Sequence, residues 1–132
     1  MFELNPNVKQ RDEIIFGAYE PKKYLGGIRK FEGLRLETLK ELSDLGHLNL
    51  FDAQNDGPTI QKFMDFMEKY PGYKAMGYVV SKDRGDYRLT VDGIEKVESH
   101  ISMAELEDFL KEFGDTAEDI TATTNCVSCW YD

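Results

Sequence analysis

Residues 58–81 read PTIQKFMDFMEKYPGYKAMGYVVS, and this stretch decides the fold because helical periodicity gives way to strand periodicity within it. Apolar side chains over 60–70 recur at the i, i+3, i+4, i+7 spacing of an amphipathic helix, which we expect to begin at the Pro-Thr step. The Pro-Gly pair that follows ends the helix. Residues 73–81 are rich in aromatic and β-branched side chains, which predicts a strand.

Three more elements are predicted toward the C-terminus. Residues 87–91 alternate apolar with polar side chains after a short loop that contains a glycine, so they predict a β-hairpin with the strand before them. Residues 102–105, Ser-Met-Ala-Glu, form a capping box that begins a helix, and Gly114 ends it. Residues 120–131 carry β-branched and aromatic side chains around a polar Thr-Asn step, which predicts a second hairpin.

The N-terminal part of the chain is predicted to be helical for the most part. Leucines recur every three residues over 35–45, and Gly46 is placed to end that helix in a left-handed conformation. A preceding helix over 21–31 begins at a proline. Residues 13–19 predict a short strand or an apolar segment laid on the core, and the polar residues 1–12 are expected to be loosely held.

The whole chain is expected to form one domain, 1–132, because no repeat, low-complexity tract or linker divides it. A chain of 132 residues buries enough surface to fold without disulfides or metals. The element order predicts an α+β fold: N-terminal helices, an antiparallel β-hairpin, a helix and a second β-hairpin, with the helices packed on one face of the sheet.

The net charge of −9 lies in the C-terminal third of the chain. Residues 92–132 contain 11 acidic and 2 basic side chains, a balance that repels nucleic acid and anionic membranes and favours a basic protein partner. A polyanion would have to bind the basic residues of segment 21–40, which we interpret as a solvated surface. They are Lys22, Lys23, Arg29, Lys30, Arg35 and Lys40.

The first residues, MFELNP, have neither the basic nor the apolar region of a signal peptide. The apolar runs are far shorter than the roughly 20 residues of a membrane span. We therefore expect a protein of the bacterial cytoplasm, in which both cysteines are reduced.

The cysteines and histidines do not form a recognisable reactive centre. Cys126 and Cys129 have the spacing of a redox pair, but no helix can follow them, and residues three apart on a strand point to opposite faces. A zinc site would need two further ligands. His47 and His100 are far apart in sequence and are expected at the surface or at element boundaries. No cofactor and no metal are expected.

A set of polar residues around two loops is the best candidate for a binding site. The turn after residue 46 does not require an amide at Gln54 or Asn55, and Arg84 stands at the tip of the first hairpin loop. Thr59 and Arg88 flank these positions in the sequence. If one patch binds a ligand, we expect it to contain these five residues.

Residues 36–91 resemble a winged helix-turn-helix domain in their order of helix, helix and hairpin, and residues 87–93, YRLTVDG, are similar to the second wing strand of such domains. The resemblance implies that 59–70 would be the recognition helix. That segment departs from the pattern because its lysines are balanced by acidic residues and its connection is longer than the 3–4 residues of a helix-turn-helix. Nucleic-acid binding is therefore not our expectation.

A second resemblance covers the C-terminal two-thirds of the chain. It rests on short strings that are similar to a family of small bacterial proteins with no assigned function: QN at 54–55, PT at 58–59, GYVVS at 77–81, DR at 83–84 and DYR at 86–88. The resemblance implies a bacterial and cytoplasmic protein. It carries no catalytic residue over to this chain.

Three functions follow as hypotheses. We expect above all a non-enzymatic protein-interaction or regulatory module that binds a basic protein through its acidic surface, or pairs with a second copy through a sheet edge. The first alternative is a winged-helix DNA-binding regulator. The second is a small enzyme with a site near Gln54, Asn55 and Arg84.

Overall fold

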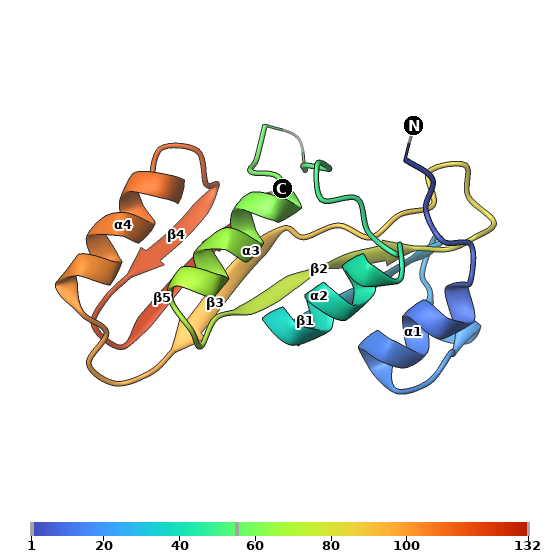
Figure 1. The fold of residues 1–132 in the computed structure, drawn as a ribbon, viewed down its shortest axis with the longest axis horizontal. Coiled ribbons are helices and arrows are strands. Elements are labelled where there is room, and N and C mark those ends of the chain that lie inside the picture. Colours follow the sequence, from blue (N-terminus) through green and yellow to red (C-terminus); the bar gives the residue numbers. More distant parts are fainter. Residues whose placement is uncertain (1, 55, 132) are drawn as a thin grey trace.

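Antiparallel strands and α-helices make up the described part of the chain, residues 2–54 and 56–131 of a computed structural model. The elements follow one another in the order shown in Figure 1: α1 (Val8–Phe16), the short 3₁₀ helix η1 (Pro21–Lys23), β1 (Ile28–Arg35), α2 (Leu36–Asp44), α3 (Ile60–Lys69), β2 (Lys74–Val80), β3 (Gly93–Val97), α4 (Met103–Phe113), β4 (Asp119–Ala122) and β5 (Cys126–Trp130). The predicted α+β fold is confirmed.

The five strands form one sheet in the order β1-β2-β3-β5-β4, and all neighbours are antiparallel. Ala75, Ile94 and Cys129 lie side by side across three strands and are buried in the core. The helices cover this face and lie in front of the sheet in Figure 1. Residues one position along each strand point the other way, to a face without a helix, which we call the open face.

Aromatic rings fill the core between the sheet and the helices α3 and α4. The ring of Phe66 lies 5.3–5.5 Å from those of Tyr73, Phe109 and Phe113, in edge-to-face arrangements. Burial of each such side chain contributes roughly 1.5–3 kcal/mol, which makes this layer the main source of stability at the C-terminal end of the sheet.

The predicted C-terminal elements are confirmed, with local differences. Thr59 caps α3 by accepting from the Lys62 amide at 3.2 Å, and Ser102 caps α4 by accepting from the Glu105 amide at 3.2 Å. The Glu105 carboxylate does not return the bond, because it pairs with the buried ammonium of Lys96 at 3.0 Å. The capping box is therefore only half formed.

The second strand of the first hairpin lies later than predicted. Residues 87–91 pair with β2 only through one bridge, Val79 to Leu89, together with backbone hydrogen bonds, and the regular strand β3 begins at Gly93. The register shifts by one residue between the Met76–Gly93 pair and the Val79–Leu89 bridge, and at this point the Thr90 carbonyl lies where a side chain of residue 77 would be.

The prediction of a helix over 21–31 is wrong. Only η1 is helical there, and β1 follows it. Gly26 and Gly27 have φ values of 62° and 80°, and Leu25 and Ile28 exchange backbone hydrogen bonds across them. Two successive left-handed residues make a tight two-residue turn that no helix can pass through, so the chain reverses and adds an edge strand to the sheet.

The expectations for the first twenty residues are also wrong in part. The segment 13–19 is not a strand, since its first four residues belong to α1, which Asn7 caps at one end and Gly17 ends with φ 83°. The polar residues expected to be loosely held include Arg11 and Asp12, which are completely buried. No helix among the described residues is long and apolar enough to cross a membrane.

Candidate functional site

Two of the expected binding residues meet at the hydroxyl of Tyr78, on the open face of β2. Gln54 Nε2 donates a hydrogen bond to Tyr78 Oη at 3.0 Å, and Arg88 Nη2 donates to the same oxygen at 2.8 Å. The Arg88 guanidinium lies 5.6 Å from the ring centroid of Tyr78. Two donors on one oxygen fix the ring in place, while the Tyr78 hydroxyl proton is donated to no described residue.

Arg84 braces the hairpin loop beside this pair. It forms two hydrogen bonds with the Asp86 carboxylate, at 2.9 and 2.8 Å, and one with the Gly26 carbonyl at 3.1 Å. Arg88 also binds Asp86, at 2.9 Å. Hydrogen bonds from Arg88 and then Arg84 lower the pKa of Asp86, so the carboxylate stays charged between the two arginines. Arg84 and Arg88 are therefore linked through the Asp86 carboxylate that both of them bind.

The structure does not bring all five expected residues together. Thr59 serves as the cap of α3. Asn55 lies outside the described residues. Gln54 and Arg88 remain as members of a common site. The sequence suggested Gln54 because the turn does not require an amide there, and Arg88 because it flanks the first hairpin loop.

The first hollow of this site lies on the open face, between Tyr78 and Trp130. It has a volume of about 440 Å³. Met76 lies between the two aromatic residues, in the same row as Gly93 and Trp130 across β2, β3 and β5. The exposed Trp130 was missed by sequence reasoning, although a tryptophan at an outward position of an alternating strand signals a contact surface. The lining residues are Lys30, Phe31, Glu32, Gln54, Met76, Gly77, Tyr78, Asp92 and Trp130.

A second hollow of about 350 Å³ continues the first along β2. The two share Glu32 and Met76, and the second is bounded by Lys74, Glu95 and Val97. Together they form one depression that follows β2 from Tyr78 to Lys74, which we call the trough. β2 forms its floor, and its lining includes both aromatic rings and charged side chains.

A buried cluster of charged residues lies at the other end of the molecule, under α1. Arg11 Nε binds Asp12 Oδ1 at 3.0 Å, Nη1 donates to the Val80 carbonyl at 3.1 Å, and Nη2 donates to Tyr24 Oη at 2.9 Å. Tyr24 Oη donates to the other carboxylate oxygen of Asp12. Burial and the bond to Asp12 raise the pKa of Tyr24. Every nitrogen and oxygen of the ion pair has a partner, so we interpret the cluster as an anchor for α1.

His47 lies beside this cluster and is 2% exposed, so it is not a surface residue. Its Nε2 lies 2.7 Å from Gln10 Oε1, an acceptor, and its Nδ1 is buried without a hydrogen-bond partner. Burial and then the Arg11 guanidinium lower the pKa of His47, against the smaller opposite effect of Asp12. The imidazole is therefore neutral in the folded protein.

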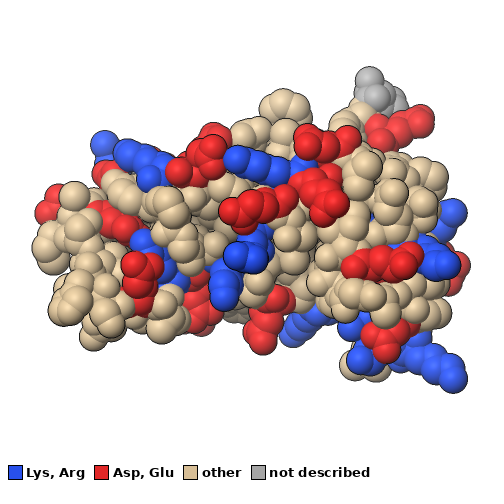
Figure 2. Space-filling view, turned by 60° about the horizontal axis from the view of Figure 1, so that its bottom comes forward, with Lys and Arg blue, Asp and Glu red and all other residues tan. Residues whose placement is uncertain are grey.

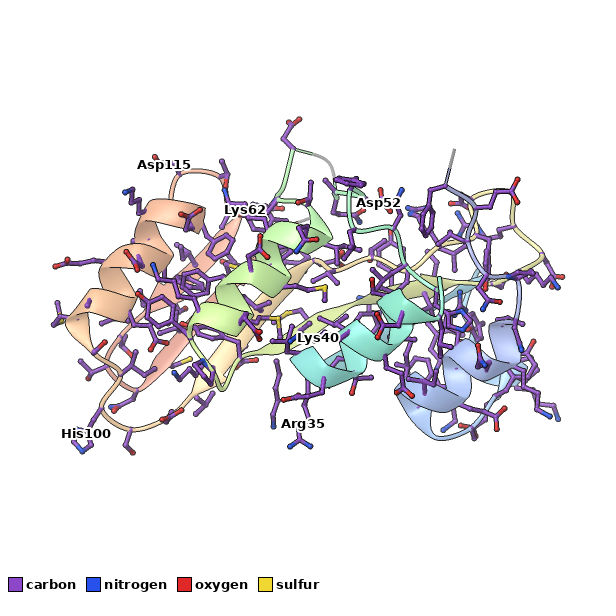
Figure 3. All side chains as sticks on the ribbon, in the orientation of Figure 1. Arg35, Lys40, Asp52, Lys62, His100 and Asp115 are labelled. Atoms are coloured by element: carbon purple, nitrogen blue, oxygen red, sulfur yellow. The ribbon has the colours of Figure 1, made fainter. Side chains whose placement is uncertain are left out.

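We expect the free energy of unfolding to fall as the pH is lowered through about 6.5, by up to about 1.4 kcal/mol per pH unit. The unfolded chain binds a proton at the ordinary His47 pKa, whereas the folded chain binds it only at a lower pH. Urea denaturation at pH values between about 7.5 and 5.5 measures the slope. His47→Gln should reduce it, and His100→Gln, a change at an exposed residue at the far end from α1, is the control (Figure 3). Equal slopes in both variants would contradict this assignment.

The helix that the winged-helix resemblance would place against DNA has its lysines in ion pairs. Lys62 binds Glu112 at 3.3 Å, and Lys69 binds Asp108 at 3.0 Å, both across the groove between α3 and α4. The basic residues that precede α3 in the sequence also have partners of their own. Arg29 lies over the Phe16 ring, 3.6 Å from its centroid, and Lys40 binds Glu68 at 3.1 Å. Figure 2 shows basic and acidic side chains interleaved across this side of the molecule. Winged-helix DNA binding therefore stays an alternative hypothesis that these contacts do not support.

The two cysteines lie on opposite faces of β5, as expected for residues three apart on a strand. Cys126 is half-buried on the open face, whereas Cys129 is buried in the core, and both thiols are free. Burial raises the pKa of Cys129 to about 12, so this thiol stays protonated and unreactive at neutral pH. Within residues 2–54 and 56–131, no group of three or more His, Cys, Asp or Glu side chains is placed to hold a metal ion.

Comparisons with models of protein families, with curated proteins and with solved structures find no match for this chain.

Proposed function

We propose that this chain is a non-enzymatic protein-interaction module of the bacterial cytoplasm, and that the trough on the open face is its contact surface. The observation that carries the proposal is the aromatic pair Tyr78 and Trp130 beside a hollow of about 440 Å³ on a sheet face that no helix covers. Tyrosine and tryptophan are the residue types most enriched where proteins bind each other.

The preorganisation of Tyr78 supports the same function. Its ring is held by Gln54 and Arg88, and Arg88 is held in turn by Asp86. A side chain that is already ordered loses little conformational entropy when a partner binds. The polar network around Tyr78 therefore contributes to binding by fixing an anchor.

Both sheet edges are poor surfaces for pairing with a second copy. β1 has a register shift between Phe31 and Leu34, and β4 contains only 4 residues. A bulged strand and a very short strand are both devices that limit edge-to-edge pairing. These features favour a contact through the open face over a homodimer through an edge.

Affinity capture from an extract of the native cells tests the proposal. Immobilised wild-type protein, Trp130→Ala and the control Leu110→Ala are compared by quantitative mass spectrometry at low and high salt. Trp130 and Leu110 are 36% and 46% exposed, so both changes remove a partly exposed apolar side chain. We expect proteins retained by the wild type and the control to fall about tenfold or more with Trp130→Ala, as for a binding hot spot. If no protein is retained in a Trp130-dependent manner, the proposal is wrong.

A further inference from the structure

The trough has the length and direction of an extended peptide segment, and this inference rests on the proposed function. It runs along β2 from Tyr78 to Lys74, a distance of roughly 13 Å at about 3.3 Å per strand residue. An extended chain laid along β2 would place about five residues over it. A depression of this shape on a flat sheet fits a peptide better than it fits a compact small molecule, which binds in an enclosed pocket.

One end of the trough is suited to an apolar ring. Met76 and Trp130 lie in one row of the open face, with Gly93 between them in the register, and both line the first hollow. Tyr78 closes this end. An aromatic or proline side chain of a partner would bury its faces against these groups, and aromatic contacts of this kind anchor peptides in shallow grooves.

The other end of the trough carries carboxylates. Glu32 and Glu95 line the same hollow, and neither is in an ion pair with a described residue. Lys74 lies between Arg35 and Glu95 in the register, so this end of the sheet holds two carboxylates and two basic side chains. The chain as a whole carries a net charge of −9. The two carboxylates without an ion pair and the acidic overall charge complement a basic side chain.

We propose that the trough binds an extended peptide segment of a partner protein in which an aromatic residue or proline lies two positions from a lysine or arginine. The spacing follows from the sheet: the row through Met76 and Trp130 and the row through Lys74 and Glu95 are two residues apart along β2. Side chains at i and i+2 of an extended peptide repeat at the same distance of roughly 6.6 Å and point to the same side.

Selection from a displayed library of random seven-residue peptides tests the proposal, with Trp130→Ala protein used for counter-selection. We expect enrichment of peptides with an aromatic residue or proline two positions from a lysine or arginine. Enrichment of acidic peptides, or of none over the counter-selected pool, would overturn the proposal.

Titration of the selected peptide into the protein measures its affinity, because Trp130 is the only tryptophan and its emission reports on the trough. The double variant Glu32→Gln and Glu95→Gln should weaken binding at least tenfold while leaving Trp130 in place. The control Glu107→Gln changes an exposed carboxylate of α4 and should leave the affinity unchanged. Equal affinities in the two variants would overturn the assignment of the charged end.

The failure of this inference can be distinguished from failure of the proposed function. Trp130-dependent capture of a native partner combined with an empty peptide selection means that the trough contacts a folded surface, which overturns only the peptide inference. Absence of any Trp130-dependent capture, together with an empty selection, overturns both.

Discussion

Asp12→Ala is expected to lower the free energy of unfolding by about 3–5 kcal/mol, which is the cost of leaving one member of a buried ion pair without its partner. Arg11 and Asp12 are both fully buried, and the carboxylate also accepts the hydrogen bond of Tyr24. The Arg11 guanidinium would keep its charge in the core and lose its counter-ion. Urea denaturation followed by circular dichroism measures the change, which is a large part of the 5–15 kcal/mol typical of a domain.

Glu68→Ala is the matched control, because it removes an exposed carboxylate from an ion pair. Lys40 and Glu68 are bonded at 3.1 Å, but their side chains are 51% and 65% exposed. Water replaces the lost partner at such a site, so we expect a change of at most about 1 kcal/mol. A loss of less than about 1 kcal/mol in Asp12→Ala as well would show that the cluster under α1 does not anchor the helix.

Gly77→Ala is expected to lower the free energy of unfolding by about 3 kcal/mol, at the upper end of the cost of overpacking. A Cβ atom at Gly77 would lie 2.0 Å from the Thr90 carbonyl oxygen, and the backbone of one strand would have to move to relieve the clash. Gly77 also lines the trough, so the same movement should weaken binding there. Equilibrium unfolding in urea gives the stability change, and the intensity of Trp130 emission reports on the local rearrangement.

Gly85→Ala is the control for the loss of a glycine by itself. Gly85 lies in the hairpin loop, and a Cβ there would meet nothing within 4 Å. A glycine replaced by alanine without strain stabilises a protein by about 0.4–1 kcal/mol, because the unfolded chain loses freedom. Similar changes in the two variants would mean that the approach of Thr90 to β2 is not close enough to exclude a side chain.

The buried charged residues of this protein and the charged residues of the trough have different roles. The buried charges are paired: Arg11 with Asp12, and Lys96 with Glu105. Glu32 and Glu95, which line the trough, are exposed and in no ion pair with a described residue. Buried charges need partners for stability, whereas unpaired charges at a surface are free to attract a complementary chain.

The elements that the sequence predicted well are those whose pattern is purely local. α3 and α4 carry uninterrupted apolar stripes and side-chain caps at Thr59 and Ser102, so the chain itself specifies where they begin. The strands β4 and β5 were predictable as a hairpin because β-branched and aromatic side chains surround the polar Thr-Asn step within residues 120–131.

The errors concern segments whose structure depends on distant partners. α1 is only weakly amphipathic, and its Arg11 is buried because the Val80 carbonyl, 69 residues away, accepts a hydrogen bond. The first part of β1 was expected to belong to a helix over 21–31, whereas the left-handed backbone of Gly26 and Gly27 makes a turn there and β1 pairs with the distant strand β2.

The sequence by itself determined the α+β class, the acidic balance and the helices α2, α3 and α4, and it placed Gln54 and Arg88 among the candidate binding residues. Only the tertiary structure decided that these two meet at one hydroxyl, since Tyr78 is 24 residues from Gln54 and 10 from Arg88. It also decided that Trp130 lies across the same face, through the pairing of β5 with β3. Strand order and register create this surface, and neither is encoded in the local spacing of residues along the chain.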